Sequence, residues 1–99
     1  MRKIEKQMLE AIKSRKDWVS KNTGVFIVSA GNPYGPRAEV YLHGNMIAAY
    51  WYNQDELEVD TRTHARWPSV TTKGRLRALG ANVYTRNHVT YLDDVALQI

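Results

Sequence analysis

The sequence contains no cysteine, and this absence removes several kinds of chemistry at once. Without a thiol the chain has no disulfide, no thiolate nucleophile and no cysteine-based zinc site, and we expect a reducing cytosol as its environment. Long apolar runs are also missing: the longest, Met46 to Trp51, is far shorter than the ~20 residues of a membrane span, so we expect no membrane segment. The basic start of the chain is not followed by an apolar stretch, and we therefore expect no secretory signal.

The composition predicts one small folded domain over residues 1–99. Apolar residues make up 43% of the 99 residues and charged residues 24%, and the aromatic residues are spread along the chain. These proportions allow one modest core and disfavour disorder. The formal net charge of +4 favours an anionic partner without requiring one.

The charges are unevenly distributed along the chain. Residues 1–21 hold seven bases and three acids, residues 55–60 hold four acids and no base, and residues 62–86 hold six bases and no acid. Two interpretations stay open. Either the acidic strand lies beside the basic helix and the two match within the molecule, or the basic segment presents a cationic surface to a partner.

The hydrophobic pattern predicts a single α+β domain in the order α-β-β-β-β-α-β-β, with an antiparallel sheet covered on one face by two helices. The first helix is expected at residues 2–16, because Ile4, Met8 and Ile12 recur at every fourth position. Alternating patterns and turn residues predict strands at 25–28, 38–42, 46–52 and 57–61. The second helix is expected at about 72–79, with Val70, Leu76 and Leu79 facing the core, and residues 83–84 and 88–92 are expected to form a closing hairpin.

No motif for catalysis or cofactor binding is found. The glycine-rich nucleotide-binding loops are absent, and the three histidines are too far apart for a zinc pair: His43, His64 and His88. A ribonuclease-like acid–base pair has no support from the spacing. His43 precedes Gly44 in a segment that favours a tight turn over a catalytic role. We therefore expect no enzyme activity, no metal and no cofactor.

The strongest functional signal is a basic stretch with an interleaved aromatic residue at 62–77. Guanidinium groups bind phosphates, and an exposed ring can stack on a base. Thr72 and Lys73 at a helix start offer a hydroxyl, free amides and an amine, although capping explains the threonine equally well. Lys73 and Arg77 are expected on the solvent side of the helix. The residues predicted to bind nucleic acid are Arg62, Arg66, Thr72, Lys73, Arg75 and Arg77.

Three consecutive aromatic residues, Tyr50, Trp51 and Tyr52, fall in a predicted strand. Successive side chains of a strand point to opposite faces, so at least one ring must point away from the core. An outward ring serves either as a stacking platform for a base or as an anchor in a protein interface. The interface would join the protein to another protein or to a second copy in a homodimer.

Two segments resemble a known family. Residues 40–48 (VYLHGNMIA) and 67–79 (WPSVTTKGRLRAL) resemble the V-x-L-H-G-N-x-I-A and W-x-T-V-T-T-K-x-R-L-x-A-L motifs of a family of small proteins from tailed bacteriophages. The likeness runs from about residue 2 to residue 92, with Ser69 where the family commonly has Thr, and Gly74 and Arg77 where it commonly has Ser and Asn. It implies a phage origin and action in the cytoplasm of the infected bacterium, and no particular activity.

Two functions therefore stay open. The first is a phage-encoded accessory protein that binds nucleic acid through its basic helix and loop. The alternative is a protein-interaction module that docks on a host factor.

Overall fold

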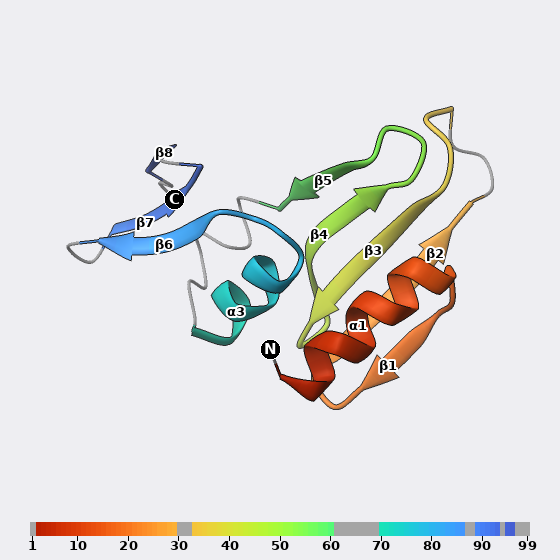
Figure 1. Cartoon of the computed structure of the whole chain (residues 1–99), viewed down its shortest axis with the longest axis horizontal. Helices are drawn as coiled ribbons and strands as arrows, with labels where there is room; N and C mark the ends of the chain where they lie inside the picture. Colours follow the sequence, from red (N-terminus) through yellow and green to blue (C-terminus); the bar gives the residue numbers. More distant parts are fainter. Residues whose placement is uncertain (1, 30–32, 61–69, 87–88, 94, 97–99) are drawn as a thin grey trace.

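The computed structural model of the chain describes residues 2–29, 33–60, 70–86, 89–93 and 95–96 (Figure 1). Its fold is α+β, as the hydrophobic pattern predicts. The elements are α1 (Lys3–Ser14), β1 (Trp18–Ser20), β2 (Thr23–Val28), β3 (Arg37–Leu42), β4 (Asn45–Trp51), β5 (Glu56–Val59), α3 (Val70–Ala78), β6 (Val83–Arg86), β7 (Val89–Leu92) and β8 (Val95–Ala96). Among the described residues, no helix is both long enough and apolar enough to span a bilayer.

The strands form two antiparallel sheets. The first has five strands in the order β1-β2-β3-β4-β5, so each strand pairs with its neighbour in sequence, and the second joins β6, β7 and β8. A tight turn connects β3 to β4, and there His43 and Gly44 have φ angles of 52° and 80°. Both angles lie in the region that this class of hairpin turn requires, which confirms the turn interpretation of His43.

Helix α1 packs on the first sheet through the stripe that the sequence predicts. Met8 and Ile12 are buried, with 0% and 8% of their surface exposed, against a core that includes Val25 and Val40 from the sheet. The helix ends where Arg15 adopts a left-handed conformation and the amide of Lys16 bonds to the carbonyl of Ala11. One acidic residue, Glu5, lies on the same buried stripe.

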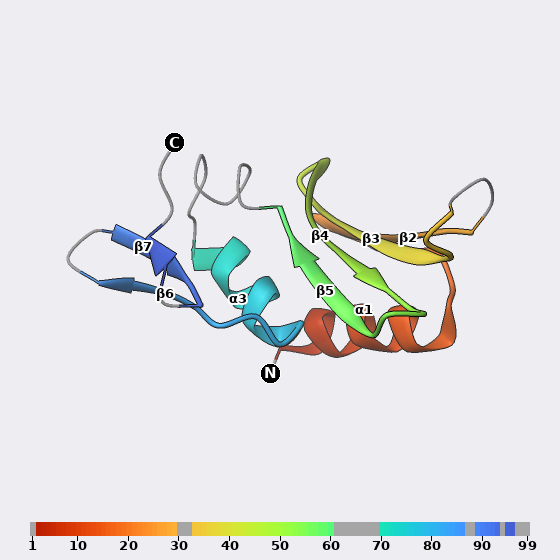
Figure 2. The same cartoon turned by 90° about the horizontal axis from the view of Figure 1, so that it is seen from above.

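Helix α3 lies beside the N-terminal end of α1, on the same side of the five-stranded sheet (Figure 2). Leu76 is fully buried and Leu79 packs against the core, as expected, but Val70 is 76% exposed. The prediction that Val70 faces the core is wrong, because it is the first residue of the helix and lies off the buried stripe. A Cβ at Gly74 would stand 3.3 Å from the Glu5 carboxylate, so glycine allows the close approach of the two helices.

The other face of the five-stranded sheet is not covered by any helix or strand in the described ranges (Figure 2). Paired residues of adjacent strands share a face, and the pair Arg37–Trp51 alternates with the pair Ala38–Tyr50. Ala38 is fully buried on the helix side. Arg37 and Trp51 therefore belong to the uncovered face.

Candidate functional site

Of the residues predicted to bind nucleic acid, the four that the structure describes differ in exposure. Arg62 and Arg66 lie outside the described residues. On α3, Thr72 and Arg75 are buried, with 5% and 3% of their surface exposed. Lys73 is half-buried and Arg77 is exposed. The structure therefore places Arg77 at the surface, Lys73 partly at the surface, and Thr72 and Arg75 in the interior, although Arg75 also lines a cleft.

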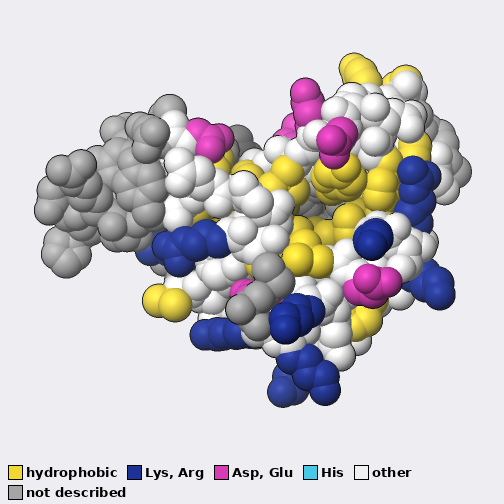
Figure 3. All heavy atoms as spheres, in the orientation of Figure 1, with side chains coloured by type: hydrophobic (Ala, Val, Ile, Leu, Met, Phe, Trp, Pro, Cys, Tyr) yellow, Lys and Arg dark blue, Asp and Glu magenta, His cyan; other side chains and the backbone are white. Residues whose placement is uncertain are grey.

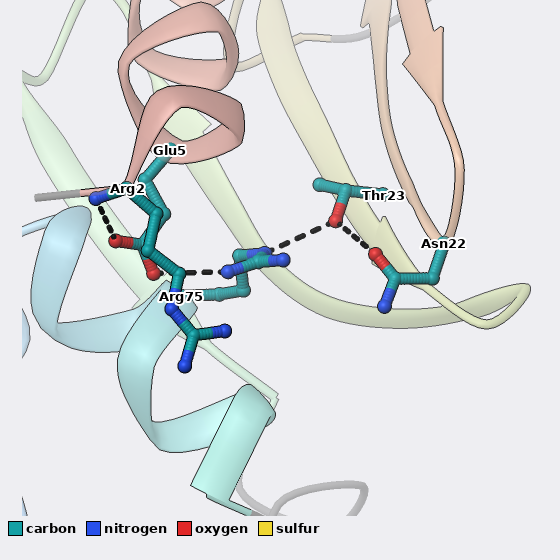
Figure 4. A network of polar contacts seen from close by, with 5 residues as sticks. All are labelled: Arg2, Glu5, Asn22, Thr23 and Arg75. Atoms are coloured by element: carbon teal, nitrogen blue, oxygen red, sulfur yellow. Dashed lines mark hydrogen bonds and ion pairs between the residues drawn. The ribbon is translucent and has the colours of Figure 1, made fainter.

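Arg75 lies at the centre of a polar network that joins α3, α1 and the start of β2 (Figure 4). Its Nη1 donates to Glu5 Oε2 at 3.0 Å, and its Nε donates to Thr23 Oγ1 at 3.1 Å. The Thr23 hydroxyl donates in turn to Asn22 Oδ1 at 2.9 Å, and the second Glu5 oxygen accepts from the Arg2 amide at 3.1 Å. This network places a guanidinium in the interior with its charge neutralised by one carboxylate.

A hydrogen bond to the backbone fixes the side chain of Arg77. Its Nε donates to the carbonyl oxygen of Val83 at 2.8 Å, while the residue as a whole remains exposed. Lys73 lies one turn earlier on α3, close to Arg77 and also to the buried Leu76, which follows it by three residues. Arg77 is exposed and Lys73 is half-buried, so the expected placement on the solvent side holds for Arg77 and only in part for Lys73.

Cations from distant parts of the sequence gather around α3. Figure 3 shows Lys and Arg side chains along the lower margin of the molecule, around α3 and the start of α1, and further Lys and Arg side chains at the opposite end. We define the basic margin as exposed cations from α1 and the β1–β2 turn together with the two α3 cations: Arg2, Lys3, Lys6, Lys21, Lys73 and Arg77. The basic margin therefore combines cations from segments that are far apart in the sequence.

A cleft opens within the basic margin, between the N-terminus of α1, the β1–β2 turn and α3. It has a volume of about 440 Å³. Half of its lining residues are cationic and none is acidic: Arg2, Lys3, Ile4, Gln7, Ser20, Lys21, Asn22 and Arg75. Such a lining favours an anion.

The three consecutive aromatic residues are divided between the two faces of the sheet. Tyr52 lies on the helix side, where its hydroxyl donates to the carbonyl of Ile12 and its ring lies 4.3 Å from the Arg15 guanidinium. Tyr50 packs edge-on against Tyr52 at 5.1 Å. Burial raises the pKa of Tyr52 above its ordinary value, although Arg15 opposes the shift. Only Trp51 of the three points to the uncovered face.

The uncovered face carries aromatic side chains from neighbouring strands. Phe26 and Tyr41 pack edge to face with their centroids 5.5 Å apart. The Arg37 guanidinium lies 5.0 Å from the Trp51 ring and forms a 2.6 Å ion pair with Glu39. The Tyr41 hydroxyl donates to Glu39 as well, and burial followed by this bond raises the pKa of Tyr41. The ring of Trp51 is therefore already in contact with the guanidinium of Arg37.

Sequence patterns missed the cleft because its residues come from segments far apart in the chain. Arg2, Lys3 and Lys21 belong to the basic N-terminal part, whereas Arg75 follows more than fifty residues later. The only local signal is the position of Glu5, which falls on the apolar stripe of α1 three residues before Met8. In the described part of the chain, no cluster of histidine and acidic side chains is suited to hold a metal ion.

Comparison with known proteins gives a family and no activity. The model of the family described as Kyanoviridae Gp96 protein, a phage protein family, matches residues 1–98. No curated protein and no solved structure matches the chain. Because the match covers nearly the whole chain, the protein belongs to this phage family.

Proposed function

We propose that this small phage protein is an accessory factor that binds nucleic acid through the basic margin. The observation that supports the proposal is that cations from two distant parts of the sequence lie near one another in the folded protein. The ion pair of Glu5 with Arg75 joins α3, which carries Lys73 and Arg77, to α1. Arg2 and Lys3 at the start of α1 line one cleft together with Lys21.

The arrangement suits a phosphate backbone better than specific bases. Cations spread along a margin neutralise several phosphates and release their counterions, which makes binding depend steeply on salt and weakly on sequence. Arg77 is already fixed by Val83 and loses little freedom on binding. No exposed acid lines the cleft at the centre of the margin.

Fluorescence anisotropy with labelled single- and double-stranded oligonucleotides at several salt concentrations tests the proposal. The variant Lys73→Gln/Arg77→Gln should bind more weakly and lower the salt slope by about one unit for each lost phosphate contact. The control Lys13→Gln/Lys16→Gln removes the same charge from exposed positions at the far end of α1 and should change binding less. If the unaltered protein binds no oligonucleotide at low salt, or if both pairs weaken binding equally, the proposal fails.

A second candidate, docking on a host protein, is favoured by the uncovered sheet face. Val19 and Phe26 expose 65% and 38% of their surface there, and the exposed Glu56 and Glu58 face the same side. This combination fits a partner surface that is apolar at its centre and basic at its edge. Docking would be favoured over nucleic-acid binding if the protein binds no oligonucleotide and if a partner that copurifies with it is lost in the variant Val19→Ser/Phe26→Ser.

A further inference from the structure

We propose that the cleft in the basic margin is a binding site for a phosphate group, with Arg75 at its base. The inference deepens the proposed function, since a terminal phosphate of a nucleic acid is one source of that group and a free nucleotide is the other. The site itself stands on the geometry of the cleft.

The first support is the hydrogen bonding of Arg75. Its side chain is only 4% exposed, and two of its nitrogens are used, Nε by Thr23 and Nη1 by Glu5. Within the described ranges no residue accepts a hydrogen bond from Nη2. Buried donors without acceptors are costly and uncommon in folded proteins. Since Arg75 lines the cleft, an anion seated there would supply the missing acceptors.

The second support is that Glu5 holds Arg75 without occupying the cleft. One Glu5 oxygen accepts from Arg75 and the other from the Arg2 amide, and Glu5 is not among the lining residues. Thr23 fixes the guanidinium from the opposite side. Arg75 is therefore oriented in advance, so that little side-chain entropy is lost when a ligand binds.

The third support is the rim. Arg2, Lys3 and Lys21 are exposed around the opening, and the first amides of α1, at Lys3 and Ile4, point out of the helix end without partners in the helix. Positive charge from the side chains and the helix dipole acts in the same direction. Ser20, Asn22 and Gln7 add neutral hydrogen-bonding groups.

Charge and size select the ligand class. A phosphate monoester carries a charge of about −1.5 to −2 at neutral pH and offers three acceptor oxygens, which suits several converging donors better than a carboxylate does. A volume of about 440 Å³ exceeds what a bare anion needs and falls within the range of small-molecule sites. The chemistry therefore fits a phosphate attached to a sugar or a nucleoside.

Calorimetric titration can test the site with four probes: inorganic phosphate, a 5′-mononucleotide, the matching nucleoside, and one oligonucleotide with or without a 5′-phosphate. We expect the mononucleotide to bind, the nucleoside not to bind, and the 5′-phosphorylated oligonucleotide to bind more tightly than its unphosphorylated form. The variant Arg2→Gln/Lys21→Gln should weaken mononucleotide binding about tenfold or more. The control Lys13→Gln/Lys16→Gln removes the same charge from exposed positions that lie outside the basic margin and do not line the cleft, and it should leave this binding nearly unchanged.

Arg75→Lys provides a separate variant, since lysine keeps the charge beside Glu5 and lacks the forked second nitrogen. If it folds, it should lose mononucleotide binding more than oligonucleotide binding. The inference is overturned if no phosphate probe binds, or if the cleft and control pairs lose binding equally. Mononucleotide binding without oligonucleotide binding would support the phosphate site and reject the proposed function. If oligonucleotides bind equally well with and without the 5′-phosphate and the mononucleotide does not bind, the proposed function is supported and the phosphate site is rejected.

Discussion

Replacing Arg75 with methionine should strongly destabilise the protein, because it leaves a buried carboxylate without its partner. The Glu5 side chain is 8% exposed and Arg75 4% exposed, and their atoms lie 3.0 Å apart. Removing one partner of such a pair typically costs about 3–5 kcal/mol. A domain of this length has a free energy of unfolding of about 5–15 kcal/mol, so the loss would be about a fifth of it or more.

Urea unfolding followed by tryptophan fluorescence and circular dichroism measures this loss. At roughly 4–8 °C for each kcal/mol in a domain of this size, the melting temperature of Arg75→Met should fall by roughly 12 °C or more. The double variant Glu5→Leu/Arg75→Met removes both charges together. It should recover most of the lost stability, because no unpaired charge stays buried.

The exposed substitution Lys13→Met is the control for the loss of one positive charge, and it should change the free energy of unfolding by less than about 0.5 kcal/mol. The reasoning is refuted if Arg75→Met unfolds within 1 kcal/mol of the unaltered protein, a limit set at about a third of the smallest expected cost. It is also refuted if the double variant loses as much as the two single variants added together.

Two further predictions concern α1 and the tyrosine beneath it. Ile12→Asp places an unpaired charge at a position 8% exposed in the core, so it should abolish the cooperative thermal transition; an unchanged melting curve would contradict the packed-helix arrangement. The pKa of Tyr52 is raised above 10.0 by burial, so the folded state favours the neutral phenol. Its stabilising contribution should be complete below pH 10 and lost as the pH rises through the folded-state pKa. Tyr52→Phe should therefore flatten the alkaline stability profile, measured by urea unfolding at several pH values alongside phenolate absorbance.

The elements that could be predicted from sequence are those in which one periodicity persists over several residues. Helix α1 repeats its apolar positions three times, and β3 alternates strictly between half-buried and buried residues along its length. The strands that the pattern missed, β1 and β8, span three and two residues. Segments so short show no alternation, and their pairing partners decide whether they become strands. The first helix ends at Ser14, before the expected residue 16, because Arg15 turns left-handed.

The candidate site was harder to predict because a charge on a helix is usually assigned to its solvent side. On α3 this rule holds for Arg77 and in part for Lys73, and it fails for Arg75, which follows Thr72 by three residues and shares its buried face. On α1 it fails for Glu5 in the same way. Each position taken alone suggests an isolated buried charge, which a protein rarely tolerates. Only the two helices together show that the charges are opposite and satisfy one another.

This pairing changes how the positive charge of the protein relates to its function. Residues 62–86 contain six cations, yet the charge of one of them, Arg75, is paired with Glu5 in the interior. The pair draws α3 onto the N-terminus of α1, where Arg2, Lys3 and Lys21 stand around the cleft. The contact that hides one cation therefore collects several others that the sequence keeps far apart. An anion site built in this way depends on the fold, so replacing Arg75 alone should reduce stability and phosphate binding together, whereas Glu5→Leu/Arg75→Met should recover most of the stability without the phosphate binding.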